Sequence, residues 1–304
     1  MKSLETRLEK GDVLLIDGGI GTEIERRGVT MDSDAWCGVA NKTYPDVIRT
    51  VHEDYIRAGA EVITANTFAT ARHVLDAAGL ADEVHVLNNT AVKLAREARD
   101  SVAEHPVWIA GSMSSTPAFR ESGLPDDEQA AANYREQAGL LAEAGVDLII
   151  AEMMSHTKNA CLVVNAASAT GLPVWVGFSA EVDRQSGEVL PWGVTRAKTP
   201  PGDLGEAIKA VVELGAVRAM GIMHTKLNDF DAALSFLRQR WSGPTMAYAE
   251  SGLWESPSWK FVGVASPEEY AQAALEWVAA GVRIVGGCCG IGPEHISELR
   301  RRLR

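Results

Sequence analysis

Two adjacent cysteines near the end of the chain carry the clearest chemistry in the sequence. Cys288 and Cys289 follow an apolar run that is typical of a buried strand, and a disulfide between direct neighbours would be strained. Thiolates bind Zn2+, and His224, which ends an earlier apolar run, could join the pair. Three protein ligands would leave the fourth tetrahedral position open, as in catalytic zinc sites. The alternative is that both cysteines are small buried residues and that the histidine makes an ordinary hydrogen bond.

An acidic residue or a glycine pair ends two other apolar runs. Gly18 and Gly19 follow Asp17, and glycines at such a position would let backbone N–H groups approach an anion such as a carboxylate. A plain turn between a strand and a helix would use the same residues. Glu152 could bind an ammonium group at the end of its run. It could equally form an internal ion pair, because a buried carboxylate needs a partner.

Three tryptophans lie in the two longest predicted loops. Trp36 is in the loop at residues 28–45, and Trp254 and Trp259 are in the loop at residues 252–267. Tryptophan faces attract cations, so these side chains could form the wall of a site for a cationic ligand. The alternative is that they only anchor the loops that carry them.

The elements that must position these residues are visible as eight short apolar runs. The runs are rich in β-branched and other apolar residues, as expected for parallel strands that are buried on both faces. They occupy residues 13–19, 61–67, 107–113, 148–154, 173–181, 216–224, 244–251 and 283–289.

Amphipathic stretches fill the gaps between the runs. Three of them, at residues 45–60, 126–147 and 266–283, leave through an Ala-Gly pair shortly before the next strand, which is typical of a glycine helix cap. Eight strand–helix units predict a closed (β/α)8 barrel, with residues 1–304 forming one domain. A doubly wound open sheet is the alternative, but no G-x-G-x-x-G follows the first strand and no P-loop occurs.

In such a barrel, the last residues of all eight strands meet at one mouth, and long loops after the strands cover it. Nearly every polar residue of the predicted strands lies at this end. We therefore expect one site there, with contributions from most strands. The residues concerned are Asp17, Asn66, Ser112, Glu152, His224, Glu250, Cys288 and Cys289.

Composition excludes several classes of partner. The chain has 29 basic and 41 acidic residues, and the net charge of −12 argues against nucleic acid or an anionic membrane surface. No apolar run approaches the roughly 20 residues of a membrane helix, and the first residues lack the apolar stretch of a signal peptide. Four cysteines in a chain of this size indicate a cytoplasmic protein with reduced thiols. The protein could form a homo-oligomer.

Four histidines lie in or beside predicted helices, away from the strand ends. We expect all four at the surface rather than at the site. They are His52, His73, His85 and His105.

The chain resembles the homocysteine S-methyltransferase family. No single matching segment is specific to this family, but the order of the segments along the chain, ending in GGCCG, is specific to it. The segments are LLIDGGIGTEIERRG at 14–28, DSDAWCG at 32–38, VHEDYIRAGAEVITANTFAT at 51–70, AGS at 110–112, SGLWESPSWKF at 251–261 and GGCCG at 286–290.

The resemblance implies a zinc-dependent thiol methyltransferase on a (β/α)8 barrel, with zinc held by Cys288 and Cys289. The family's third ligand is a cysteine in a GINC-like segment, where this chain has GIMH and therefore His224. Histidine also binds zinc, so a Cys2His site is feasible. The family's NSG likewise reads ESG here, with Glu250 in the first position.

The resemblance also implies roles at the mouth. Asp17 and Glu152 would be catalytic residues, acting on the polar end of a thiol acceptor such as homocysteine. Substrate would be bound by Gly18, Gly19, Trp36, Asn66, Ser112, Glu250 and Trp259. The donor would be a small sulfonium or quaternary ammonium compound, such as S-methylmethionine or a betaine. A zinc-dependent hydrolase or lyase on the same barrel, or a relative that binds ligand without catalysis, are the alternatives.

Overall fold

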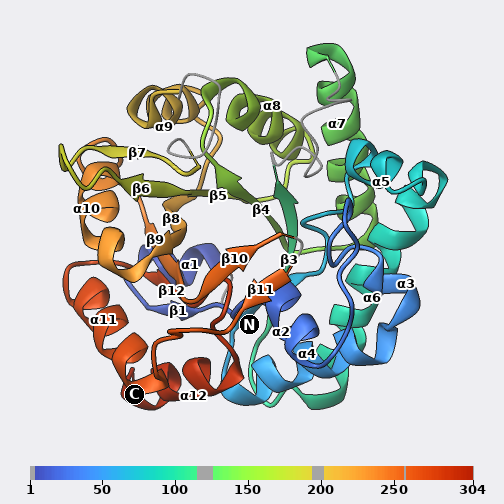
Figure 1. Cartoon of the computed structure of the whole chain (residues 1–304), viewed down its shortest axis with the longest axis horizontal. Coiled ribbons are helices and arrows are strands. Elements are labelled where there is room, and N and C mark those ends of the chain that lie inside the picture. The colour runs from blue at the N-terminus through green and yellow to red at the C-terminus, as the bar shows by residue number, and fades with distance from the viewer. Residues whose placement is uncertain (1–3, 115–125, 194–201, 257, 304) are drawn as a thin grey trace.

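The computed structural model describes residues 4–114, 126–193, 202–256 and 258–303, and eight parallel strands form its centre (Figure 1). Neighbouring strands pair in the order β1-β12-β9-β8-β5-β4-β3-β2, and a parallel bridge between Ile16 and Val62 joins the two ends into a barrel. The strands are β1 (Leu14–Leu15), β2 (Val62–Ala65), β3 (Trp108–Ser114), β4 (Leu148–Met154), β5 (Val174–Phe178), β8 (Ala219–Lys226), β9 (Thr245–Glu250) and β12 (Ile284–Val285). The predicted (β/α)8 barrel is confirmed.

One long helix follows each strand and packs on the outside of the barrel, as Figure 1 shows. Gly59 and Gly145 cap two of these helices with φ angles of +106° and +84°, a conformation that glycine adopts without steric conflict. The outer helices are α4 (Pro45–Ala58), α6 (Val84–Val102), α7 (Asp127–Ala144), α8 (Thr157–Ser168), α9 (Leu204–Glu213), α10 (Leu227–Arg238), α11 (Pro267–Ala279) and α12 (Pro293–Arg302). Among the described helices, none has the length and apolar content needed to cross a membrane.

Short helices complete the two ends of the barrel. Helix α1 (Leu4–Glu9) covers the end opposite the mouth, where Leu4 and Leu8 join the apolar residues of the barrel interior. Arg7 of this helix donates to the Glu61 carboxylate at 2.6 Å. The other short helices are α2 (Ile20–Arg26), α3 (Ala40–Thr43), α5 (Arg72–Ala77) and the 3-10 helix η1 (Ala81–Glu83).

Two antiparallel hairpins extend from the barrel. β6 (Ala180–Val182) pairs with β7 (Val189–Pro191), and β10 (Leu253–Glu255) pairs with β11 (Ser258–Lys260). The predicted strand at residues 173–181 is therefore too long, because the barrel strand ends at Phe178 and the chain then enters the first hairpin. The long loop predicted after the seventh strand carries the second hairpin, which lies in front of the barrel in Figure 1.

His52 does not lie at the surface, and that expectation was wrong. Its side chain is fully buried on the inner face of α4, and neither ring nitrogen has a hydrogen-bond partner among the described residues. Burial lowers the pKa of His52 to about 4, so the ring is neutral at pH 7.

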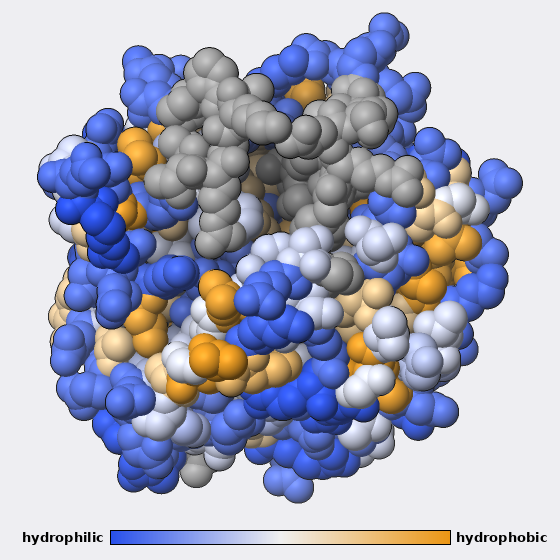
Figure 2. Space-filling model, in the orientation of Figure 1, coloured by the Kyte–Doolittle hydropathy of each residue, from blue (hydrophilic) through white to orange (hydrophobic). Residues whose placement is uncertain are grey.

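The face of the molecule seen in Figure 2 is mostly hydrophilic, with hydrophobic residues in small separate patches.

Candidate active site

The structure brings His224, Cys288 and Cys289 together at the mouth of the barrel. One ligand atom from each residue lies within 4.8 Å of the other two. The Cys288 Sγ is 3.6 Å from the His224 Nδ1 and 3.9 Å from the Cys289 Sγ. Ligands of a tetrahedral zinc are separated by about 3.6 Å for sulfur and nitrogen and about 3.8 Å for two sulfurs. The donor set and its spacing therefore fit a tetrahedral metal ion.

A local distortion of β8 directs His224 into this group. The pairing register between β8 and β9 shifts between Met223 and Lys226, and His224 has a φ of +42°, which a non-glycine residue rarely adopts. A bulge of this kind turns a side chain away from the direction that regular strand alternation would give it. Such strained backbone is typical of functional sites.

Glycine makes the turn of the two cysteines possible. Gly290 has a φ of +82°, and a Cβ at this position would lie 1.7 Å from the Ser251 carbonyl oxygen. The cysteines themselves are held by the end of β9, since the Cys288 amide donates to Ala249 and the Cys289 carbonyl accepts from Ser251, both at 2.9 Å. The turn thus packs directly against β9, the strand that neighbours β12 in the barrel.

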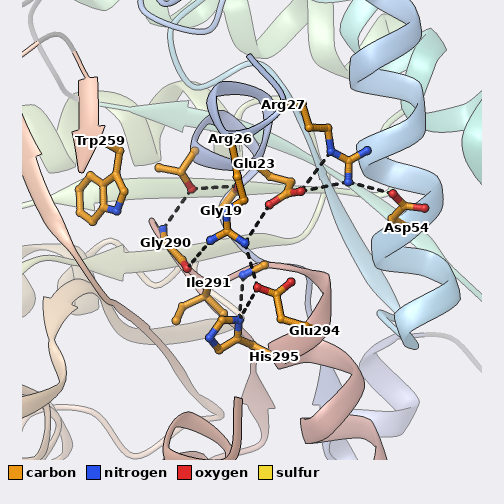
Figure 3. Close-up of polar contacts among 12 residues, drawn as sticks. Gly19, Glu23, Arg26, Arg27, Asp54, Trp259, Gly290, Ile291, Glu294 and His295 are labelled. Carbon is orange, nitrogen blue, oxygen red and sulfur yellow. Dashed lines mark hydrogen bonds and ion pairs between the residues drawn. The ribbon is translucent and has the colours of Figure 1, made fainter. Parts of the chain in front are cut away.

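Helices α2 and α12 anchor the turn from the other side (Figure 3). The Thr22 hydroxyl accepts a hydrogen bond from the Gly290 amide at 3.1 Å. Arg26 donates to the Gly290 carbonyl at 3.1 Å and to Glu294 at 2.8 Å. His295 accepts from the Gly292 amide at 3.1 Å. Sequence reasoning missed these supporting residues. Thr22 and Arg26 have partners more than 200 residues away along the chain, and His295 binds a backbone group within an irregular turn.

Glu250 places a buried negative charge beside His224. Its Oε2 lies 3.0 Å from the His224 Nδ1, and the two side chains are only 5% and 8% exposed. Burial by itself lowers the pKa of His224, but the Glu250 carboxylate and Cys288 outweigh it and raise the pKa to about 9. The neighbouring Cys289 thiol and the His224 ring hold the pKa of Cys288 well below its ordinary value. Cys288 is therefore prepared to be a thiolate, the form that binds metals.

Asp17 and Glu152 are carboxyl groups at other strand ends of the mouth. Asp17 accepts hydrogen bonds from the Thr64 amide at 2.6 Å and the Thr64 hydroxyl at 3.0 Å, and burial raises its pKa to about 7. Ser112 donates its hydroxyl to Glu152, and desolvation raises the pKa of that carboxyl to about 8. Perturbed pKa values of this kind cluster at functional sites.

The glycines and Asn66 of the predicted site are packed into the framework around it. A Cβ at Gly18 would lie 2.2 Å from the Ile291 carbonyl oxygen, and one at Gly19 would lie 2.7 Å from the Cys288 carbonyl oxygen. The Gly19 amide donates to Ile291 at 3.0 Å. The Asn66 side chain donates to the Cys37 carbonyl at 2.9 Å, so it holds the loop after β1. Contact of these three residues with substrate stays a prediction.

Tryptophans surround the metal group. Trp259 and Trp192 both lie near His224, with ring centroids 6.1 Å and 5.0 Å from its ring. Trp254 contacts Trp259 at 6.5 Å and Trp36 at 6.0 Å, so the two predicted loops meet over the mouth. Trp192, which follows the β6–β7 hairpin, was missed because sequence reasoning found no element there.

A cavity of about 380 Å3 opens between the two hairpins, next to the metal group. Glu250, Trp192 and Trp254 line it, and the first two contact the histidine. Other lining residues have acidic and basic side chains. These are Glu181, Asp183, Arg184, Lys226 and Asp229.

Comparison with known proteins places this site in context. The model of the family described as homocysteine S-methyltransferase matches residues 14–303. The homocysteine S-methyltransferase of Escherichia coli is 29% identical over 98% of this chain and 98% of its own length. Betaine–homocysteine S-methyltransferase 1 of Danio rerio is 27% identical over 98% of this chain and 74% of its own length.

A solved structure has the same fold and bears on the metal. The E. coli homocysteine methyltransferase MmuM, in the crystal form described as metallated, matches with a TM-score of 0.75 and 26% identity. The match covers 97% of this chain and 98% of that one. A metal at the mouth of this barrel is thus consistent with both the ligand spacing and the similarity.

Proposed function

The chain belongs to the homocysteine S-methyltransferase family and is a methyltransferase, and on that premise we propose that it methylates homocysteine from a small sulfonium or quaternary ammonium donor. S-methylmethionine and betaines are the donors that we favour. The observation that carries the proposal is the group of His224, Cys288 and Cys289 at the mouth, beside the carboxyl groups of Asp17 and Glu152 and a tryptophan-lined cavity.

We infer that the metal is Zn2+ and that these three residues hold it. Two sulfur ligands and one imidazole are a donor set that zinc accepts readily, and three protein ligands leave one position for substrate. The chemistry that the metal supplies is to keep the acceptor's sulfur deprotonated, since the thiolate is the nucleophile. Everything else in the reaction depends on how the chain orients its two substrates.

Asp17 and Glu152 are proposed to bind the polar end of homocysteine. The Glu152 carboxylate would pair with the ammonium group of the substrate. The positive charge of that group would compensate the carboxylate for the hydration that it loses at this site. Backbone groups near Gly18 and Gly19 would receive the substrate carboxylate, with Asn66 and Ser112 supporting that end of the pocket. The acceptor would then point its sulfur toward the cysteines.

The donor is proposed to occupy the cavity between the hairpins. A sulfonium or ammonium cation suits a wall made of Trp192, Trp254 and the Glu250 carboxylate, with Trp36 and Trp259 closing the mouth. The acceptor sulfur forms a bond to the methyl carbon while the bond from that carbon to the donor's sulfur or nitrogen breaks. The electron pair of the broken bond stays with the donor, which leaves as a neutral group, and correct alignment supplies much of the rate.

The test is methyl transfer between defined substrates. Purified protein is incubated with homocysteine and methyl-labelled S-methylmethionine or glycine betaine, and labelled methionine is measured with each substrate omitted in turn. We expect label in methionine only when both substrates are present. Turnover of one compound alone would favour a hydrolase or lyase, and no turnover with any donor would contradict the proposal.

Metal content tests the cofactor separately. Elemental analysis of the purified protein should find about one zinc per chain, and a His224→Ala variant should hold much less. A zinc-free wild-type protein that also fails to take up zinc after reduction and refilling would exclude this part of the proposal.

A further inference from the structure

Glu250 and His224 meet because of the bulge between their strands. Across the distorted part of the ladder, Glu250 of β9 pairs with Lys226 of β8 rather than with a residue closer to His224. The histidine ring, turned by its positive φ, then lies with its Nδ1 3.0 Å from the Glu250 Oε2. Both side chains are buried, so the contact is formed by the interior of the site and not by chance at the surface.

Glu250 acts on the metal group through this histidine. Among the described residues, the group whose ligand atoms all lie within 4.8 Å of one another contains the histidine and the two cysteines, and Glu250 is not a member of it. Carboxylates that bind a metal-ligating histidine fix the orientation of the ring and make it a stronger donor. The Glu250 Oε2 lies beside Nδ1, so it can support the ring in this way when Nε2 faces the metal.

Charge gives the contact a second role. Two thiolates and a neutral imidazole bring a charge of −2 to a divalent metal, whereas three thiolates would bring −3. A more positive centre withdraws more electron density from a bound acceptor sulfur, which makes that sulfur a poorer nucleophile. A buried carboxylate in contact with the imidazole returns one negative charge to the same place, and in a site with little water this charge acts strongly.

We propose that Glu250 is a positioning residue that orients His224 and restores to the Cys2His metal group the negative charge that a third thiolate would provide. This inference rests on the proposed function, since it requires that the three residues bind zinc. The charge that Glu250 contributes is independent of which ring nitrogen faces the metal, but its orienting role requires that Nε2 faces the metal and that Nδ1 carries the proton, because the carboxylate lies against Nδ1.

The experiment is a double-substitution cycle measured by zinc affinity. The four proteins are wild type, Glu250→Gln, His224→Cys and the double variant, each tested by competition with a chromophoric zinc chelator. We expect Glu250→Gln to weaken zinc binding about 10- to 100-fold when residue 224 is histidine. When residue 224 is cysteine, a third thiolate carries the charge, and the same change should alter affinity less than about 3-fold.

Two further variants separate this role from a structural one. Asp229→Asn removes a buried carboxylate that lines the same cavity but pairs with Arg184, and it should leave zinc affinity unchanged. Glu250→Asp keeps the charge on a shorter side chain and should bind zinc more tightly than Glu250→Gln. In the Co2+-substituted protein, Glu250→Gln should shift the visible d–d bands, because the imidazole becomes a weaker donor.

The outcomes distinguish the two proposals. Equal losses of zinc affinity in the histidine and cysteine backgrounds, or no loss in the histidine background, would overturn the role of Glu250. A Glu250→Asp protein that binds zinc no better than Glu250→Gln would do the same, and this comparison holds even if one background folds poorly. A wild-type protein that binds no zinc would instead exclude the proposed zinc cofactor, on which this inference rests.

Discussion

A buried thiol can give up its proton only where its surroundings hold the resulting charge. At the mouth of this barrel the Cys289 thiol and the His224 ring face the Cys288 sulfur, and its pKa is lowered accordingly. Cys161, on the outside of α8, has no such surroundings, and burial raises its pKa instead. The difference between these two cysteines is therefore one of position.

Replacing Cys289 by serine should remove the activity without unfolding the protein. A serine hydroxyl keeps its proton near neutral pH and is a poor zinc ligand. We expect kcat/KM to fall at least about 100-fold, together with most of the zinc, while the thermal unfolding of the metal-free protein changes little. The control is Cys161→Ser, which should keep both zinc and activity. A Cys289→Ser protein with full activity would exclude the metal mechanism.

Replacing Glu152 by glutamine should weaken recognition of the acceptor's ammonium group. A hydrogen bond between charged groups contributes about 1.5–3 kcal/mol, so the KM for homocysteine should rise about 10- to 100-fold. An acceptor without the amino group, 4-mercaptobutanoate, provides the control. Wild type should use it as poorly as the variant uses homocysteine, and the variant should barely distinguish the two. Discrimination that survives in Glu152→Gln would show that the ammonium binds elsewhere.

At the scale of elements, the ligand-bearing turn depends on its two neighbouring helices. Thr22 of α2 is buried, accepts from the Gly290 amide and donates to the Gly19 carbonyl. Thr22→Val keeps the shape and leaves both groups without this partner, which should lower the free energy of unfolding by about 1–3 kcal/mol. Zinc affinity should fall with it, because the turn that holds the cysteines loosens.

Thr245→Val is the matched control for that change. Thr245 begins β9 at the opposite end of the barrel, and its hydroxyl donates to Gly243 at 3.3 Å. Its loss should lower stability without weakening zinc binding. If both variants bind zinc as tightly as wild type, α2 has no role in holding the ligands.

Helix α4 should make the protein sensitive to mild acid through His52. The folded-state pKa of about 4 lies below the value of about 6.5 in the unfolded chain, so the unfolded state binds the proton first. The folded state is therefore favoured above pH 6.5 and loses stability as pH falls from 6.5 toward 4, by up to about 3 kcal/mol. Urea unfolding at pH 7.5 and pH 5 should show this loss.

His52→Leu should remove most of that pH dependence, because leucine fills the site and does not titrate. His85→Leu, at an exposed position on α6, is the control and should keep the wild-type profile. An unchanged difference between pH 7.5 and pH 5 in His52→Leu would mean that other groups carry the acid sensitivity.

The barrel strands could be predicted from sequence, but the hairpins and the bulge could not. Runs of apolar residues identify strands because both faces are buried, and all eight strands occur where such runs were found. The β6–β7 hairpin has three-residue strands that leave no such pattern, so Trp192 was missed. The positive φ at His224 depends on pairing between β8 and β9, which local sequence does not encode.

At the scale of the whole molecule, predicting the barrel was enough to bring most of the candidate site residues to one end. Once eight strands point the same way, their last residues must meet, and Glu152, Ser112, His224, Glu250 and the cysteines do. The contact between His224 and Glu250 was not foreseen, since two neighbouring strand ends can present their side chains in many directions. The topology of the barrel decides that the strand ends converge, whereas the contact between two particular side chains depends on their own conformations.

The same topology separates stability from chemistry along the barrel axis. The mouth carries carboxyl groups, thiols and strained backbone, while the opposite end is closed by Leu4 and Leu8 of α1 packed on the barrel interior. In barrels of this type the end away from the mouth contributes to stability and not to catalysis. A substitution in α1 should therefore change the free energy of unfolding and leave activity and metal binding unchanged.

Leu8→Ala tests this separation. Removing most of a buried leucine side chain should lower the free energy of unfolding by about 2–3 kcal/mol, since the space left under the strands is only partly refilled. Zinc content and kcat/KM at 25 °C should stay within about 2-fold of wild type, because α1 lies at the end of the barrel opposite the proposed ligands. Denaturant unfolding and the labelled-methyl assay on the same preparation make the comparison. A Leu8→Ala protein that keeps its fold but loses zinc would show that the two ends are coupled, and that α1 helps set the geometry of the mouth.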